Sequence, residues 1–307
     1  MDSLVANRFQ MGRVIGRGAF GEVHLGVDRD TLEEVAIKVE PGMSKWPRLL
    51  YEAKVCKSLA GRPGFPQLRY CGFESRKKVL VMGLLGPSLE RLRTVCGGTL
   101  SFKTILMLGD QLVERLEILH SEGYVHRDIG PQNILLGRGK DAGLVHLIDY
   151  GLCKRFKDPE TQKHIADRDG KPIKGTLWFA SLNALRGREV SRRDDLEAVG
   201  YVLMYLLQGH LPWQDLPETY TRSAEFEALK QARVSLSVQD MCASLEYGRR
   251  ELSEYLSYCR GLGFKDCPDY CLLRRIFTEA MAREGYLYDC EFDWASPGPE
   301  ASLPGCL

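Results

Sequence analysis

Apolar residues change their spacing once along this chain, and the change restricts the folds that the chain can adopt. From residue 9 to about residue 85 they mostly alternate with polar residues, as at Val23, Leu25 and Val27, and a period of two is typical of strands. Residues 46–61 interrupt the alternation with apolar steps of three and four, which predicts a helix. The first lobe is therefore predicted to be mostly sheet with one main helix.

The rest of the chain has helical spacing. Residues 101–123 carry an apolar stripe between a serine and a glycine, and residues 194–208 are apolar nearly all round, which predicts a buried central helix. We therefore expect a bilobal α+β domain over residues 9–294, with a small β-rich lobe to about residue 85 and a larger helical lobe from about residue 86. Residues 295–307 are rich in Pro, Gly and Ser and predict a short disordered tail.

Composition and charge exclude several kinds of partner. The 42 Lys and Arg residues nearly balance the 41 Asp and Glu residues, so a net charge of +1 gives no electrostatic reason to expect nucleic acid or an anionic membrane. The most apolar run, residues 198–214, is shorter than the ~20 residues that span a bilayer and contains Gly, His and Pro. We expect a monomer without nucleic-acid or membrane partners.

The ten cysteines are scattered, and the chain opens without the charged and apolar segments of a signal peptide. We therefore expect reduced thiols and a cytoplasmic or nuclear location, or both. Cys267 and Cys271 form the closest pair, but no second pair with ligand spacing accompanies them, so no zinc site is expected there.

A glycine-rich segment, "IGRGAFGEV" at residues 15–23, has the spacing G-x-G-x-x-G. Dinucleotide-binding folds share this spacing, but a helix follows it there, whereas the residues after Gly21 alternate as in a strand. Glycines between two strands let backbone N–H groups approach phosphate oxygens. An ordinary glycine-rich hairpin is the alternative interpretation of this segment alone.

Charged and polar residues follow three later apolar runs. Lys38 ends "EVAIK" and needs an anionic partner if buried, which Glu52 on the predicted helix could supply together with nucleotide phosphates. Asp128 in "HRDIGPQN" could accept the proton of an attacking hydroxyl, while Asn133 and Asp149 offer hard oxygen ligands for Mg²⁺. Singly these could be a surface lysine, caps or turn residues, but the ordered set indicates phosphoryl transfer.

These motifs resemble those of a eukaryotic protein kinase, and specifically of the casein kinase 1 family. The kinase motifs are the glycine segment, "VAIK", "HRD" and "DYG", the last in place of the commoner DFG. The family motifs are "LLYEAK", "VLVMGLLGPSLE", "SRRDDLEAVGYVLMY", "LPWQ" and "YDCEFDW", with "GTLWFASLN" where other kinases carry A-P-E. The resemblance covers residues 9–294 and implies a Ser/Thr protein kinase that uses ATP and Mg²⁺ on protein substrates.

The resemblance also assigns roles to matching positions. The implied catalytic residues are Lys38, Glu52, Asp128 and Asn133, with Asn133 and Asp149 as metal ligands. Asp195 would brace the catalytic loop, and Arg127, Lys154 and Lys171 would form a substrate anion patch unless they are solvated or structural side chains. The implied ATP contacts are Ile15, Gly16, Arg17, Gly18, Ala19, Phe20, Gly21, Glu22, Val23, Ala36, Lys38, Met82, Leu84, Leu85 and Leu135.

Three positions depart from the family pattern. Gly130 stands where a Lys reaches the γ-phosphate, and loss of one preorganised charge costs about 10²–10³ in turnover, so we expect a slow kinase that Gly130→Lys accelerates. Trp178 replaces an Arg and Asp215 a Gly, which predicts a weaker preference for phosphate-primed substrates. The alternative is a nucleotide-binding pseudokinase that acts as an interaction scaffold.

Overall fold

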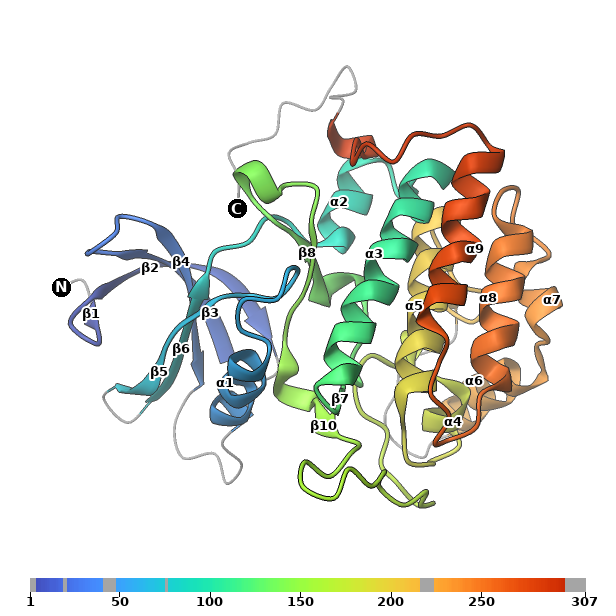
Figure 1. The fold of residues 1–307 in the computed structure, drawn as a ribbon, viewed down its shortest axis with the longest axis horizontal. Coiled ribbons are helices and arrows are strands. Elements are labelled where there is room, and N and C mark those ends of the chain that lie inside the picture. Colours follow the sequence, from blue (N-terminus) through green and yellow to red (C-terminus); the bar gives the residue numbers. More distant parts are fainter. Residues whose placement is uncertain (1–3, 19–20, 41–47, 75–76, 216–223, 296–307) are drawn as a thin grey trace.

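The computed structural model describes residues 4–18, 21–40, 48–74, 77–215 and 224–295. It confirms the expected bilobal α+β fold, with a sheet at one end of the molecule and a group of helices at the other (Figure 1). Two predicted ATP contacts, Ala19 and Phe20, lie outside the described residues, as does nearly all of the predicted tail.

The first lobe is one antiparallel sheet with the strand order β1-β2-β3-β4-β6-β5. Its strands are β1 (Leu4–Val5), β2 (Phe9–Gly18), β3 (Gly21–Asp28), β4 (Glu34–Glu40), β5 (Leu68–Glu74) and β6 (Lys77–Gly83), and its helix is α1 (Arg48–Ser58).

Side chains of the sheet alternate between two apolar clusters, because neighbouring residues of a strand point to opposite faces. Val35, Ile37 and Val39 of β4 pack in one cluster with β6 valines, while Leu80 packs with α1 in the other. Lys38 pairs in register with Leu80, so its side chain points to the α1 face. The alternation therefore directs the only charged residue in the middle of β4 toward the helix.

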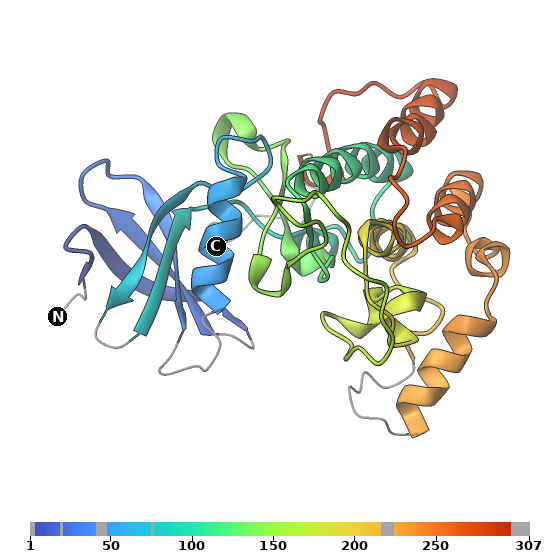
Figure 2. The same cartoon turned by 60° about the horizontal axis from the view of Figure 1, so that its bottom comes forward.

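The second lobe is built around two buried helices that contact each other, α3 and α5 (Figure 2). The predicted cap is present, since the side chain of Ser101 accepts a hydrogen bond from Thr104 N at the start of α3. The helices are α2 (Leu89–Val95), α3 (Phe102–Ser121), α4 (Leu182–Leu185), α5 (Arg192–Gln208), α6 (Ala224–Ser235), α7 (Val238–Cys242), α8 (Arg249–Gly261) and α9 (Tyr270–Arg283).

Short strands and 3-10 turns connect α3 to α5 and carry the polar motifs. Two pairs of strands form, β7 (Tyr124–Val125) with β10 (Lys154–Arg155) and β8 (Ile134–Leu136) with β9 (Val145–Leu147). The 3-10 turns of this region are η1 (Pro131–Asn133), η2 (Gly139–Asp141), η3 (Tyr150–Leu152) and η4 (Leu177–Phe179), and a further turn, η5 (Asp293–Ala295), follows α9.

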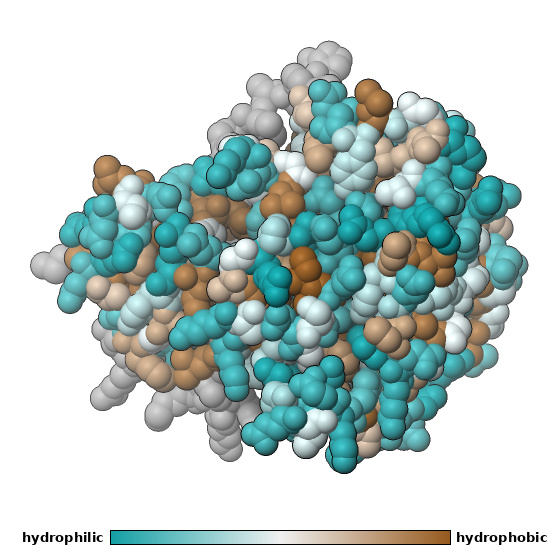
Figure 3. Space-filling model, in the orientation of Figure 1, coloured by the Kyte–Doolittle hydropathy of each residue, from teal (hydrophilic) through white to brown (hydrophobic). Residues whose placement is uncertain are grey.

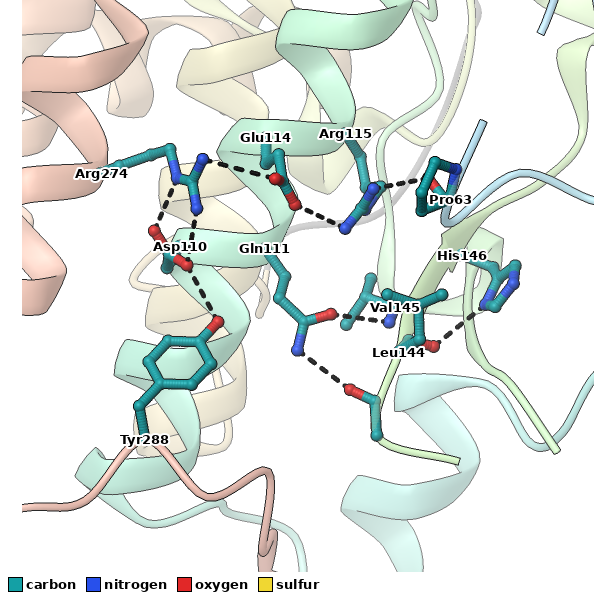
Figure 4. Close-up of polar contacts among 11 residues, drawn as sticks. Pro63, Asp110, Gln111, Glu114, Arg115, Leu144, Val145, His146, Arg274 and Tyr288 are labelled. Carbon is teal, nitrogen blue, oxygen red and sulfur yellow. Dashed lines mark hydrogen bonds and ion pairs between the residues drawn. The ribbon is translucent and has the colours of Figure 1, made fainter. Parts of the chain in front are cut away.

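Polar side chains of α3 join three parts of the molecule (Figure 4). Arg115, which is buried, donates to Pro63 O in the loop after α1. Gln111 donates to Gly143 O and accepts from Val145 N of β9. Asp110 accepts from Arg274 of α9 and forms an ion pair with it. Helix α3 thus holds the first lobe, the β8–β9 hairpin and α9 in one arrangement.

The face in Figure 3 is mostly hydrophilic, with smaller apolar areas between the polar side chains. Within the described ranges, no helix is both long and apolar enough to cross a membrane. Among those same residues, no group of three or more His, Cys, Asp or Glu side chains is arranged to hold a metal ion, and each described cysteine is a free thiol.

Candidate active site

A cleft between the lobes brings the predicted nucleotide residues together. Every described residue of the predicted ATP set lines this cleft except Glu22, and Asp128, Asn133 and Asp149 line it as well. Glu22 instead forms an exposed ion pair with Arg17, with 3.1 Å between Oε1 and Nε. Ile148, at the end of the apolar run before Asp149, is a lining residue that the motif comparison missed.

The glycine segment is the end of the β2–β3 hairpin, where Gly18 is in register with Gly21. Gly21 has φ +138°, and a Cβ there would lie 2.1 Å from Val39 O, so its position excludes any side chain. A Cβ on Gly18 would meet no atom within 4 Å, which leaves open space beside its backbone. This hairpin has the strand–glycine–strand form that approaches phosphates.

Lys38 lies between two carboxylates. Its Nζ is 2.8 Å from Glu52 Oε2 of α1 and 3.0 Å from Asp149 Oδ1, which comes after β9. Burial lowers the pKa of Lys38, but the two carboxylates outweigh burial and raise it above its ordinary value. The ammonium is therefore held in the charged form at the wall of the cleft.

The two carboxylates differ in their environment. Burial raises the pKa of Glu52 to about 7, against the opposing effect of Lys38. Burial also acts to raise the pKa of Asp149, but Lys38 and the Gly151 amide lower it overall. Asp149 adopts the left-handed region with φ 64° and lines the cleft. Asp149 is thus the carboxylate poised to bind a cation there.

Asp128 and Asn133 are held by the backbone of their own loop. Asn133 Nδ2 donates to Asp128 O at 3.0 Å, which leaves the amide Oδ1 as the atom for a cation. Asp128 N donates to His126 Nδ1 at 3.3 Å, and His126 Nε2 donates to Ile148 O at 3.0 Å. These bonds connect the loop that carries Asp128 to the strand that leads to Asp149.

A residue that the motifs did not predict, Thr176, contacts the side chain of Asp128. Thr176 N and Oγ1 lie 3.0 and 3.3 Å from Asp128 Oδ1. Thr176 belongs to the "GTLWF" stretch, 48 residues along the chain, so local spacing gives no signal of the contact. One carboxylate oxygen of Asp128 is therefore held by protein groups.

The buried carboxylate of Asp195 lies beneath the same loop, at the start of α5. Its oxygens accept from His126 N at 2.7 Å, from Arg127 N at 2.8 Å and from His120 Nε2 at 2.9 Å. Burial acts to raise the pKa of Asp195, but the hydrogen bonds from His120 and from the Arg127 amide lower it overall. Asp195 thus fixes two consecutive backbone amides just before Asp128.

The ring of His120 extends this contact to α9. Burial lowers the pKa of His120, so the ring is neutral at pH 7. Because Asp195 can only accept, Nε2 donates to it and Nδ1 accepts from the Tyr270 hydroxyl at 2.7 Å. Helices α3, α5 and α9 therefore meet in one chain of hydrogen bonds that ends at the loop of Asp128.

Positive side chains gather in a second pocket beside Asp128, which Arg127, Lys154, Lys171 and Lys174 line. Lys154 and Lys171 share the carboxylate of Glu189, at 2.7 and 3.4 Å. Arg127 donates to the backbone carbonyls of Leu152 and Cys153.

Four acidic residues also line this pocket, namely Asp128, Glu189, Asp194 and Asp195. Burial lowers the pKa of Lys174, and the charges of Arg127, Arg48 and Lys154 lower it further. The cationic residues that line the pocket, which include Arg188, exceed the acidic ones by one, so any attraction of anions depends on the local placement of Arg127 and the lysines. The structure brings the three residues of the predicted anion patch together.

Trp178 and Asp215 occupy different surroundings. Trp178 is half-buried against the main core, and its carbonyl accepts from Trp213 Nε1 at 3.0 Å. Asp215 is exposed and is the last described residue of the segment that follows α5. At position 178, where the motif resemblance implies an Arg, the chain carries an indole, and Arg127, Lys154, Lys171 and Lys174 line the pocket beside Asp128.

The hairpin, the paired Lys38 and the facing acidic and amide groups define a cleft suited to phosphoryl transfer from a nucleotide. The protein kinase domain family model matches residues 9–259 of the chain. This match spans most of the sequence and agrees with the bilobal fold, so the chain belongs to the protein kinase family.

Proposed function

We propose that this protein is an ATP-dependent serine/threonine protein kinase of the casein kinase 1 type. The observation that supports the proposal most strongly is the meeting of five groups in one cleft below the glycine hairpin. These groups are Lys38, Glu52, Asp128, Asn133 and Asp149. The substrate class rests on the resemblance of the motifs, and "HRDIGPQN" lacks the Arg that tyrosine kinases carry four residues after the Asp.

The residues present fit ATP and Mg²⁺. Asp149 and Asn133 offer hard oxygen ligands, and the space beside Gly18 leaves room for phosphates. Met82 lines the cleft near Leu84 and Leu85, whose backbone would meet the adenine edge. Leu84 N already donates to Glu34 O at 3.4 Å, so Leu85 is the better candidate for that contact.

Different side chains of the site would have different roles in phosphoryl transfer. Bound Mg²⁺ would neutralise phosphate charge beside Asn133 and Asp149. Lys38, kept charged by Glu52, would hold the phosphates in place. Asp128 would accept the proton of the substrate hydroxyl on the carboxylate oxygen that Thr176 does not hold.

Transfer of labelled phosphate from ATP to casein is expected with Mg²⁺ and not with EDTA, and the label should lie on Ser or Thr. The matched control is Asp149→Asn, which keeps the side-chain shape but removes the charge that binds the cation. If wild type and Asp149→Asn transfer equally, the proposed site is wrong. If ATP and Mg²⁺ raise the melting temperature without transfer, the pseudokinase alternative replaces this proposal.

Phosphate-primed and unprimed peptides are expected to differ by less than about tenfold in kcat/KM, an effect of about 1.4 kcal/mol. The physical reason is the half-buried indole of Trp178 where a positive charge is usual. The measurement compares matched peptides at fixed ionic strength, with Lys171→Ala as the control for the remaining pocket. A larger difference that Lys171→Ala removes would show that the pocket beside Asp128 is sufficient for priming.

We also propose a monomer that acts in the cytoplasm, the nucleus or both. The free thiols of the described cysteines support this location.

A further inference from the structure

The backbone at Gly130 does not require a glycine. Gly130 has φ −161° and ψ 158°, which is extended backbone that any residue adopts. A Cβ at this position would lie 2.7 Å from both Nε2 and Oε1 of Gln132. The amide of Gln132 therefore occupies the space into which a side chain at position 130 would extend.

The same amide contacts the group that holds the catalytic carboxylate. Gln132 Nε2 donates to Thr176 Oγ1 at 2.8 Å, and Thr176 Oγ1 lies 3.3 Å from Asp128 Oδ1. A hydroxyl has one hydrogen to donate. When its oxygen accepts from Gln132, that hydrogen is free to point at Asp128.

We propose that Gln132 is a positioning residue for phosphoryl transfer, whose amide fills the space beside Gly130 and orients the Thr176 hydroxyl toward Asp128. This inference rests on the proposed kinase function. The amide carries no charge, so it orients the base without neutralising phosphate. A lysine at position 130 would compete with Gln132 for the same space.

The first test measures kcat and KM of Gln132→Ala with ATP and a peptide substrate. One hydrogen bond is worth about tenfold at most, so we expect kcat to fall by about three- to tenfold with both KM values unchanged. Gln132 is exposed, so the melting temperature should not change. The matched control is Gln208→Ala, which removes an amide hydrogen bond of the same length, 2.8 Å to His210 O, at the end of α5.

A double-mutant cycle with Thr176→Val tests whether Gln132 acts through the hydroxyl. Both changes interrupt the same chain of hydrogen bonds, so their effects on kcat should not add. In the Thr176→Val background, Gln132→Ala should therefore lower kcat by less than about twofold, which is the scatter within which independent effects add. Full additivity would overturn the inference. An unchanged kcat in Gln132→Ala, with transfer by the wild type intact, would overturn it while leaving the kinase function standing. Absence of transfer by the wild type would overturn both.

The competition for space gives a second test. Gly130→Lys alone must displace the Gln132 amide, whereas Gly130→Lys with Gln132→Ala meets no such obstacle. We expect the double variant to exceed the single one in kcat by about threefold or more, the scale of one hydrogen bond. If the two variants have equal kcat, position 130 and Gln132 do not share the space and the inference fails.

Discussion

Asp128→Asn is expected to lower kcat by about 10²–10⁴, the contribution of a general base, while KM for ATP stays the same. An asparagine fits the site because its oxygen can still accept from Thr176 N, as Asp128 Oδ1 does at 3.0 Å. Its NH₂ group would then replace the second carboxylate oxygen and could not accept a proton. Steady-state kinetics with a protein substrate measure the effect.

Melting temperature and ATP affinity distinguish a loss of chemistry in Asp128→Asn from a loss of folding or of nucleotide binding. Asp128→Asn should melt at the wild-type temperature and bind ATP with the wild-type affinity, because the cleft walls at Lys38 and Asp149 are unchanged. A kcat within threefold of wild type would show that another group takes the proton. Asp141→Asn, an exposed change in η2, controls for loss of one negative charge.

Asp195→Ala is expected to lower the free energy of unfolding by at least about 3 kcal/mol, because two buried donors and one part-buried donor lose their acceptor and each such loss costs about 1–3 kcal/mol. The donors are His126 N, Arg127 N and His120 Nε2. Urea denaturation measures the change. Transfer activity should fall as well, since these amides hold the loop just before Asp128.

The control for this prediction is Asp158→Ala. Asp158 also accepts from two backbone amides, those of Glu160 and Thr161, but it is exposed. Water can replace the lost acceptor there, so we expect a much smaller loss of stability than for Asp195→Ala. Similar losses for Asp158→Ala and Asp195→Ala would mean that burial of the Asp195 acceptor is not the cause.

The spacing of apolar and charged residues predicts those parts of the fold that depend on near neighbours in the chain. Alternation places Lys38 on the α1 face, and the cost of a buried unpaired ammonium predicts a partner for it. Glu52 is that partner at 2.8 Å. The stripe over residues 101–123 likewise corresponds to α3, with Ser101 as its cap.

Contacts between distant segments give no signal in the spacing of residues, and the brace by Asp195 was expected from the motif resemblance alone. Glu189 neutralises two lysines of the anion patch, and Thr176 holds Asp128, yet neither lies near its partners in the chain. Membership of the glycine segment does not decide where a side chain points, and Glu22 pairs with Arg17 without lining the cleft. Gly130 has no side chain, which suggests open space beside it. The fold of the loop instead places the Gln132 amide in that space.

The attachments between the lobes limit how the cleft can open. On one side Gly86 N donates to Leu136 O, and on the other Leu147 N donates to Gly64 O while Arg115 holds Pro63. Two ion pairs add to these attachments, Lys38 with Asp149 at 3.0 Å and Arg138 with Glu34 at 2.8 Å. Opening the cleft would therefore break charged contacts at its walls, while Arg115 of α3 keeps the loop after α1 in place.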